Sequence, residues 1–134
     1  MNYILDTSAV IRLYIPDGPI PEQLEKAIHE AERGEGILCA PELLLAEAAH
    51  VIYKKKTAGL LSGDEAEVLL DAVLRLPIRY ISHNELILRA FNLAAECALT
   101  VYDALFLALA EQQAGKLISA DDRLHSAAER VGLA

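Results

Sequence analysis

The sequence predicts an α/β fold, a three-layer α/β/α sandwich around a central parallel sheet of four to five short strands. Short apolar runs alternate along the chain with longer amphipathic segments. Strands that alternate with helices in this way form a parallel sheet covered by helices on both faces. The chain has 134 residues, 54% of them hydrophobic. Because that is the size of one ordinary domain with a well-filled core, we expect residues 1–134 to form a single domain.

Each predicted strand is a short, mainly apolar run that ends near Pro, Gly, Ser or Asp. On this basis we expect strands at residues 2–5, 37–40, 78–81 and 116–119. The chain nearly ends after the fourth of these, so any fifth strand must be very short or absent.

The helices are predicted from apolar periodicity and from the residues that begin or end them. We expect helices at about residues 8–14, 21–33, 41–57, 62–76, 84–98, 102–114 and 122–130. Pro41 suits the first position of a helix. Ser62 and Glu65 have capping-box spacing, and Pro77 stops the helix that they begin. Gly115 is expected to cap the helix before it.

Composition limits the class of protein. No apolar stretch approaches the roughly 20 residues needed to span a bilayer, and the start of the chain lacks signal-peptide features, so we expect a soluble, cytoplasmic protein. Cys39 and Cys97 lie in apolar segments, which favours buried, reduced thiols. The formal net charge is -8, which is unusual for a nucleic-acid binder, although metal ions could bring a phosphate to an acidic site.

Four acids scattered along the chain are expected to meet at one edge of the predicted sheet. Asp6 and Asp121 follow predicted strands, whereas Glu47 and Asp103 lie early in predicted helices. In a parallel α/β sheet the helix starts and the strand ends share one edge, where such folds place their ligand sites. Clustered carboxylates repel one another unless a cation neutralises them, and oxygen ligands favour hard ions such as Mg²⁺ or Mn²⁺. The pattern therefore indicates a metal site.

Helix capping is the competing explanation for three of these acids. Thr100 and Asp103 have capping-box spacing, either Ser119 or Asp121 could cap the last helix, and Asp6 could cap the first. Glu47 differs, because its neighbours one turn away include Leu43, Leu44 and Val51, so we expect a carboxylate on a mainly apolar helix face. Ser8, Thr100 and Ser119 could support carboxylates or metal-bound water, again with capping as the alternative.

The segments that carry the four acids resemble those of the PIN-domain nucleases, in particular the small single-domain VapC-type toxins of toxin-antitoxin pairs. The segments are Tyr3-Ile4-Leu5-Asp6-Thr7-Ser8, Pro41-Glu42-Leu43-Leu44-Leu45-Ala46-Glu47, Thr100-Val101-Tyr102-Asp103-Ala104-Leu105 and Leu117-Ile118-Ser119-Ala120-Asp121-Asp122-Arg123-Leu124. The resemblance covers nearly the whole chain. It departs at the C-terminus, where the family commonly has a fifth strand.

The resemblance implies both chemistry and partners. Asp6, Glu47, Asp103 and Asp121 would be the metal-binding catalytic acids, with Ser8 or Ser119 supporting them, in a Mg²⁺- or Mn²⁺-dependent endoribonuclease that cuts single-stranded RNA. Members of the family usually dimerise and are neutralised by a small antitoxin protein. The hydrophobic composition also suggests a homodimer, with the predicted helices at residues 42–57 and 84–98 as candidate contact surfaces.

An aspartyl-phosphate enzyme is disfavoured, because Asp6-Thr7-Ser8 lacks a second acid two residues on and no lysine follows the fourth strand. A second alternative is a PIN-fold protein- or RNA-binding module without activity. The presence of all four acids argues against it. A housekeeping RNA-processing nuclease is a further alternative.

Overall fold

The computed structural model describes all 134 residues, and its central sheet has four parallel strands. The strands are β1 (Asn2–Leu5), β2 (Ile37–Pro41), β3 (Ile78–Ile81) and β4 (Lys116–Ile118), in the spatial order β3-β2-β1-β4. β1 is central and pairs with both β2 and β4, so Ile4 and Leu5 are fully buried. The predicted parallel sheet is confirmed, with four strands.

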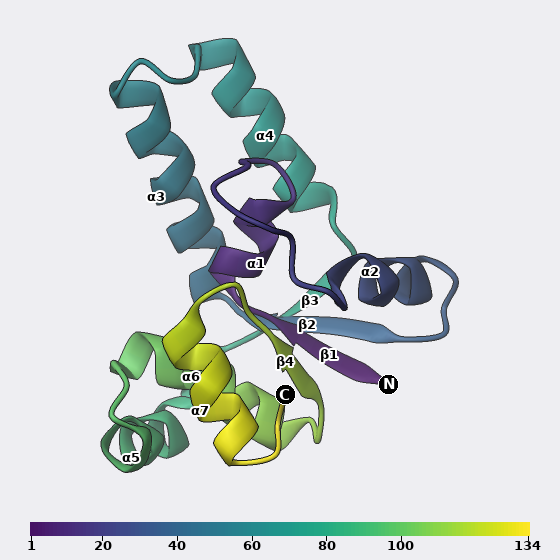
Figure 1. The fold of residues 1–134 in the computed structure, drawn as a ribbon, viewed down its shortest axis with the longest axis vertical. Coiled ribbons are helices and arrows are strands. Elements are labelled where there is room, and N and C mark those ends of the chain that lie inside the picture. The colour runs from purple at the N-terminus through teal and green to yellow at the C-terminus, as the bar shows by residue number, and fades with distance from the viewer.

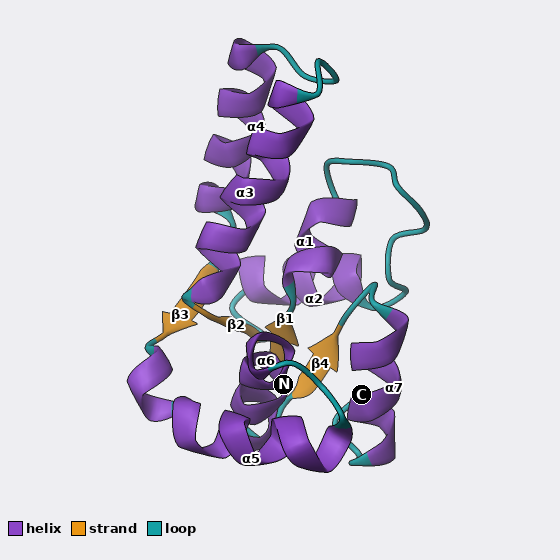
Figure 2. Cartoon of the chain, turned by 90° about the vertical axis from the view of Figure 1, so that its left-hand side faces the viewer, coloured by secondary structure: helices purple, strands orange, loops and turns teal.

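Helices cover both faces of the sheet, which confirms the predicted three layers. They are α1 (Thr7–Arg12), α2 (Leu24–Glu32), α3 (Leu43–Thr57), α4 (Gly63–Arg75), α5 (Ile87–Cys97), α6 (Val101–Gln112) and α7 (Asp122–Arg130). Figure 2 shows α1 and α2 on one side of the strands and α5, α6 and α7 on the other. The α3–α4 hairpin extends away from the sheet (Figure 1). No single helix is long and apolar enough to cross a membrane; only α5 and α6 together would qualify, and they are bent by 110° at their junction.

α6 is the central helix of the core. Seven consecutive residues, Ala104 to Ala110, are buried, because α6 packs against β1, β2 and β4 on one side and against α5 on the other. A helix that is apolar all round is expected to be enclosed in this way. Its position fixes its first turn, which carries Asp103. Both cysteines are free thiols; Cys39 is buried in the same core, as predicted, whereas Cys97 is only partly buried against it.

Several predicted helix boundaries were wrong. α1 spans only Thr7–Arg12, and α2 begins at Leu24 rather than residue 21. Pro41 ends strand β2, where it pairs with Ile81, and does not begin a helix. A proline at a strand end needs no N–H donor. The helix expected at residues 84–98 is divided, because Ser82 caps a separate 3₁₀ turn and α5 begins at Ile87.

The junction between α6 and β4 also differs from the prediction. The residue with positive φ is Ala114, at 49°, so Gly115 is not the left-handed cap of α6. Gly115 instead permits close packing against β1, since an added Cβ would lie 2.6 Å from Ile4 Cδ1 and 2.7 Å from the Asn2 carbonyl oxygen. Its lack of a side chain allows β4 to start directly beside β1.

The C-terminal tail covers part of the outer edge of β4. Leu117 N donates a hydrogen bond to the Leu133 carbonyl at 2.7 Å, and Leu133 packs against the core. The tail lies where the resemblance suggested a fifth strand, but a single hydrogen bond does not make a strand, and the sheet has four. The tail leaves β4 as the edge of the sheet.

Candidate functional site

The structure brings all four predicted acids to one pocket. The pocket has a volume of about 170 Å³ and is lined by Asp6, Thr7, Ser8, Glu47, Asp103, Phe106 and Asp121. The acids come from the end of β1, the first half of α3, the first turn of α6 and the loop after β4. The convergence expected from the sequence is therefore present in the fold.

The strand order explains where this pocket lies. The chain passes from β1 to β2 to β3 in one direction across the sheet and then returns to place β4 on the other side of β1. The gap between the carboxyl ends of β1 and β4 is the switch point of the sheet, where open α/β sheets bind ligands. Asp6 follows β1 and Asp121 lies just beyond β4, so the two acids occupy opposite sides of this gap.

Asp6 is the most enclosed of the four acids, with an exposed fraction of 4%. Its Oδ1 accepts a hydrogen bond from Ala9 N at 2.9 Å and thereby caps α1. Ser8 Oγ lies 2.8 and 2.9 Å from its two oxygens, and Ser119 Oγ donates to Oδ2. The Asp6 side chain thus caps α1 and lines the pocket at the same time.

Burial raises the pKa of Asp6 to about 6. The hydrogen bonds from Ser119, Ala9 and Ser8 oppose this shift, and the charge of Asp121 adds to it. A carboxyl group removed from water favours its neutral form unless a positive charge is brought beside it. A cation that enters the pocket would therefore favour the ionised form of Asp6.

Asp103 lies in the first turn of α6 and is partly buried. Its backbone N donates to Thr100 Oγ1 at 3.1 Å, so Thr100 caps the helix, and the Asp103 side chain lines the pocket. Burial and the charge of Asp121 raise the pKa of Asp103, against the hydrogen bond from Thr100 and the charge of Arg123. Asp103 and Asp121 thus repel each other across the pocket.

Glu47 is half-buried and is held by a neighbour that the sequence analysis missed. Thr7 Oγ1 donates to Glu47 Oε1 at 2.7 Å. In the sequence, the only indication that Thr7 belongs to the site is its position directly after Asp6. The hydrogen bond orients Glu47 toward the end of β1.

Asp121 is exposed at the rim of the pocket and caps α7. Its Oδ1 accepts from Leu124 N at 3.0 Å, which settles the choice between Ser119 and Asp121 as the cap. Ser119 Oγ instead accepts from Asp121 N at 2.9 Å while it donates to Asp6. The buried serine therefore links the two acids.

The three hydroxyls predicted to support the acids divide into two groups. Ser8 and Ser119 both contact Asp6, and Ser8 Oγ also accepts from Ala120 N at 3.0 Å, which joins the ends of β1 and β4. Thr100 does not line the pocket; its hydroxyl acts as a helix cap. For Thr100 the capping alternative is therefore the one that the structure shows.

The residues fit a hard divalent cation by their chemistry. All charged groups that line the pocket are carboxylates, and hydroxyls surround them. Such an oxygen-only donor set suits Mg²⁺ or Mn²⁺. In the present side-chain conformations, no three of the acids are placed to hold one ion together. Glu47 is hydrogen-bonded to Thr7, and Asp121 is hydrogen-bonded to the first turn of α7. The pocket is thus preorganised mainly at Asp6.

Comparison with known proteins gives three findings. Residues 3–130 match the PIN domain family. The chain is 35% identical over 126 residues to Ribonuclease VapC3 of Pyrobaculum aerophilum, an alignment that covers 92% of each protein. The fold resembles the crystal structure of PAE2754 from Pyrobaculum aerophilum with a TM-score of 0.69 and 23% identity, over 95% of this chain and 84% of that one.

Proposed function

Because the chain belongs to the PIN domain family, we propose that it is a ribonuclease that cleaves single-stranded RNA internally with the help of Mg²⁺ or Mn²⁺. The observation that carries this proposal is the convergence of four carboxylates, from four separate elements, on one pocket at the switch point of the sheet. Repulsion among these acids raises the free energy of the metal-free protein, which a fold is expected to tolerate only where a bound cation offsets it.

The roles of the residues follow from their positions. A bound divalent ion would polarise the phosphate and lower the pKa of an attacking water. Asp6 would be the fixed ligand, because its two oxygens are oriented by Ser8 and Ser119. Asp103 would add a ligand from α6, and Glu47 and Asp121 would add theirs once released from Thr7 and from the first turn of α7. The pocket lining contains no histidine or cysteine.

We propose that this nuclease is the toxin of a toxin-antitoxin pair, supported by the relative whose name is Ribonuclease VapC3. The antitoxin would lay a helix or an extended segment over apolar surface near the acidic pocket and bring a basic side chain toward it. The test is to co-express any short protein encoded immediately upstream and to solve the structure of the complex. A partner bound far from Asp6 and Asp103, or cleavage unaffected by the partner, contradicts the proposal and favours a housekeeping nuclease.

A homodimer is the second partner proposal, supported by apolar side chains that the single chain leaves in solvent. α5 exposes Ile87, Leu88 and Phe91, with Leu88 77% exposed, and α3 exposes Tyr53. An apolar surface of this kind on helices is typical of a protein contact. Both helices were selected from the sequence, and the exposed side chains favour α5.

Two measurements test the ribonuclease proposal. Crystals soaked in Mn²⁺ should show anomalous density among Asp6, Glu47, Asp103 and Asp121, and the protein should cut single-stranded RNA only when Mg²⁺ or Mn²⁺ is present. Density without cleavage would support a metal-binding module that has lost activity. If the crystals show no density and the protein does not cleave RNA, the metal-dependent mechanism is excluded and a PIN-fold binding module is left.

A further inference from the structure

A second pocket, of about 350 Å³, lies between α7 and the turn that joins α5 to α6. One wall is the turn itself, residues 97–99, in which Ala98 has a left-handed backbone with φ of 54°. The other wall is one face of α7, made by Asp122, Arg123, Ser126 and Arg130. Spacings of three, four and seven residues place these side chains on one side of the helix. The pocket is therefore a groove with two arginines along one wall.

The two arginines are available to bind an anion. Neither forms an ion pair with a carboxylate. Arg123 Nη2 donates to the Ala98 carbonyl at 3.0 Å, a contact that positions the guanidinium without neutralising it. Asp122 is the one acid in the lining, so two positive charges face one negative charge. The groove is locally cationic in a chain whose net charge is -8.

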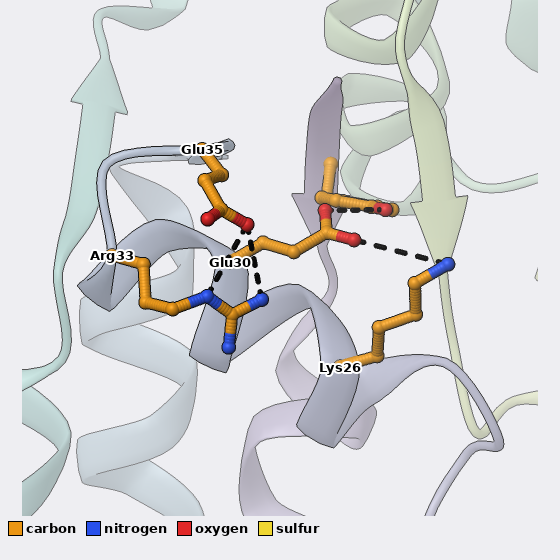
Figure 3. Close-up of polar contacts among 5 residues, drawn as sticks. Lys26, Glu30, Arg33 and Glu35 are labelled. Atoms are coloured by element: carbon orange, nitrogen blue, oxygen red, sulfur yellow. Dashed lines mark hydrogen bonds and ion pairs between the residues drawn. The ribbon is translucent and has the colours of Figure 1, made fainter.

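Many other basic side chains of the chain are already paired. Figure 3 shows Arg33 bound to Glu35, through contacts of 3.2 and 3.1 Å, and Lys26 beside Glu30. Arg89 likewise binds Glu111, and Arg75 binds Asp71. A paired guanidinium gains less from a new anion than an unpaired one, since it must give up its partner or share it. Arg12 and Arg79 also lack an ion pair, and Arg123 and Arg130 differ from them because the two line one pocket together.

The groove adjoins the acidic pocket. Asp122, in its lining, directly follows Asp121, which lines the acidic pocket. Arg123 lies close enough to Asp103 to favour the ionised form of that carboxylate, as the lowering effect of Arg123 on the pKa of Asp103 shows. The groove and the acidic pocket therefore lie side by side at the start of α7.

We propose that this groove is a subsite for a phosphodiester group of the RNA strand, outside the bond that is cut. The proposal rests on the ribonuclease function proposed above and names how that function holds its substrate. Guanidinium groups pair with phosphate oxygens through two parallel hydrogen bonds, and Ser126 offers a hydroxyl donor between them. A local cationic groove would let a strongly acidic protein bind RNA, since the phosphates supply most of the binding energy to nucleic acid.

Arg130→Gln is the decisive variant. Arg123 also acts on Asp103, so its removal would alter the acidic pocket, whereas Arg130 is not among the charges that shift the pKa of Asp103. Arg33→Gln is the matched control, because it removes the same charge from the end of α2, next to the segment Glu35–Gly36 that leads into the start of β2. The strand starts lie at the edge of the sheet opposite the acids.

RNA binding should be measured by fluorescence anisotropy in the Asp6→Asn background, with single-stranded RNA of about 12 nucleotides. Arg130→Gln should weaken binding roughly fivefold at low salt and reduce the slope of log K against log salt by about 0.7, the value for one lost phosphate contact on a single strand. Arg33→Gln should bind as the parent does. In cleavage assays Arg130→Gln should raise KM and leave kcat unchanged, and the effect should vanish with a dinucleotide too short to reach the groove.

The outcomes separate the subsite from the ribonuclease function. A parent that cleaves RNA while Arg130→Gln binds RNA like Arg33→Gln overturns the subsite and leaves the function standing. A parent that does not cleave RNA, but whose Arg123 and Arg130 side-chain NMR signals shift with RNA, overturns the function and supports the groove as an RNA site, provided that the Arg123 signal does not shift in the Arg130→Gln variant. No RNA binding by the parent overturns both. An equal loss with the dinucleotide would also contradict the subsite.

Discussion

The Ser119 hydroxyl donates a hydrogen bond to the carboxylate of Asp6, across 113 positions of sequence. The same oxygen accepts from Asp121 N, so one buried serine connects the acid that follows β1 to the acid that follows β4. The contact exists because β1 and β4 are neighbours in the sheet. It gives the most buried carboxylate of the pocket a fixed orientation before any ligand binds.

Asp6→Asn should stabilise the metal-free protein above pH 6. The pKa of Asp6 in the folded protein is about 6, above the ordinary value of 3.8, so the folded state binds the proton more tightly than the unfolded state does. The carboxyl group therefore destabilises the fold increasingly as the pH rises through this interval, by on the order of 3 kcal/mol at most. Asparagine does not ionise and still caps a helix.

Urea unfolding of both proteins from about pH 4 to about pH 8, without metal, measures this effect. The difference in free energy of unfolding between Asp6→Asn and the parent should grow between pH 4 and pH 6 and then remain constant. A difference that does not vary with pH would show that Asp6 keeps an ordinary pKa.

Asp103→Asn should abolish metal-dependent RNA cleavage without loss of stability. The Thr100 cap is made to the backbone N of Asp103, which the substitution keeps, and the substitution removes a charge that is repelled by Asp121. The variant should melt at or above the temperature of the parent without metal, and Mn²⁺ should raise its melting temperature less. Asp64→Asn, on the exposed first turn of α4, is the control for charge. A destabilised and fully active Asp103→Asn protein would contradict the metal site.

Thr100→Ala should lower stability and leave cleavage intact. Loss of this N-cap is expected to reduce the free energy of unfolding by about 1 kcal/mol, while the pocket lining is unchanged. Melting curves and a cleavage assay at saturating RNA and Mn²⁺ check both parts. A large fall in kcat at full stability would show that Thr100 takes part in the site after all.

Unlike Thr100→Ala, Ser119→Ala should change cleavage, through its effect on Asp6. The substitution removes a donor that lowers the pKa of Asp6, so the pKa of Asp6 should rise further and cleavage should be lost at higher pH than in the parent. The rate against pH at saturating metal is the measurement, and Ser119→Thr, which keeps the hydroxyl, should restore part of the activity. Equal pH profiles for Ser119→Ala and the parent would refute a role in positioning Asp6.

Phe91→Glu should convert a dimer into a monomer. Phe91 is 68% exposed on α5, so the change should not disturb the fold, but it would place a charge in an apolar contact. Sedimentation at micromolar concentration should give a dimer for the parent and a monomer for the variant. Tyr53→Glu on α3 is the companion variant, and loss of the dimer only in that protein would move the contact to α3. A monomeric parent would remove the homodimer proposal.

The sequence determined the features that depend on neighbouring residues. Apolar runs placed all four strands, and Ser62 with Glu65 predicted a capping box that the structure contains. The rule that helix starts and strand ends share an edge was enough to bring the four acids together, because it follows from the direction of the chain alone. Boundaries were less certain, as at Pro41, where pairing with β3 extends the strand over a residue suited to a helix start.

The tertiary structure decided which side chains touch and how far each is removed from water. The hydrogen bonds from Thr7 to Glu47 and from Ser119 to Asp6 join residues 40 and 113 positions apart, and no local pattern specifies them. Likewise, only the packing of α7 against the α5–α6 turn shows that Arg123 and Arg130 line a groove beside the acids. Short-range interactions select strands, helices and caps, whereas burial, pKa values and contacts between side chains depend on how those elements pack in space.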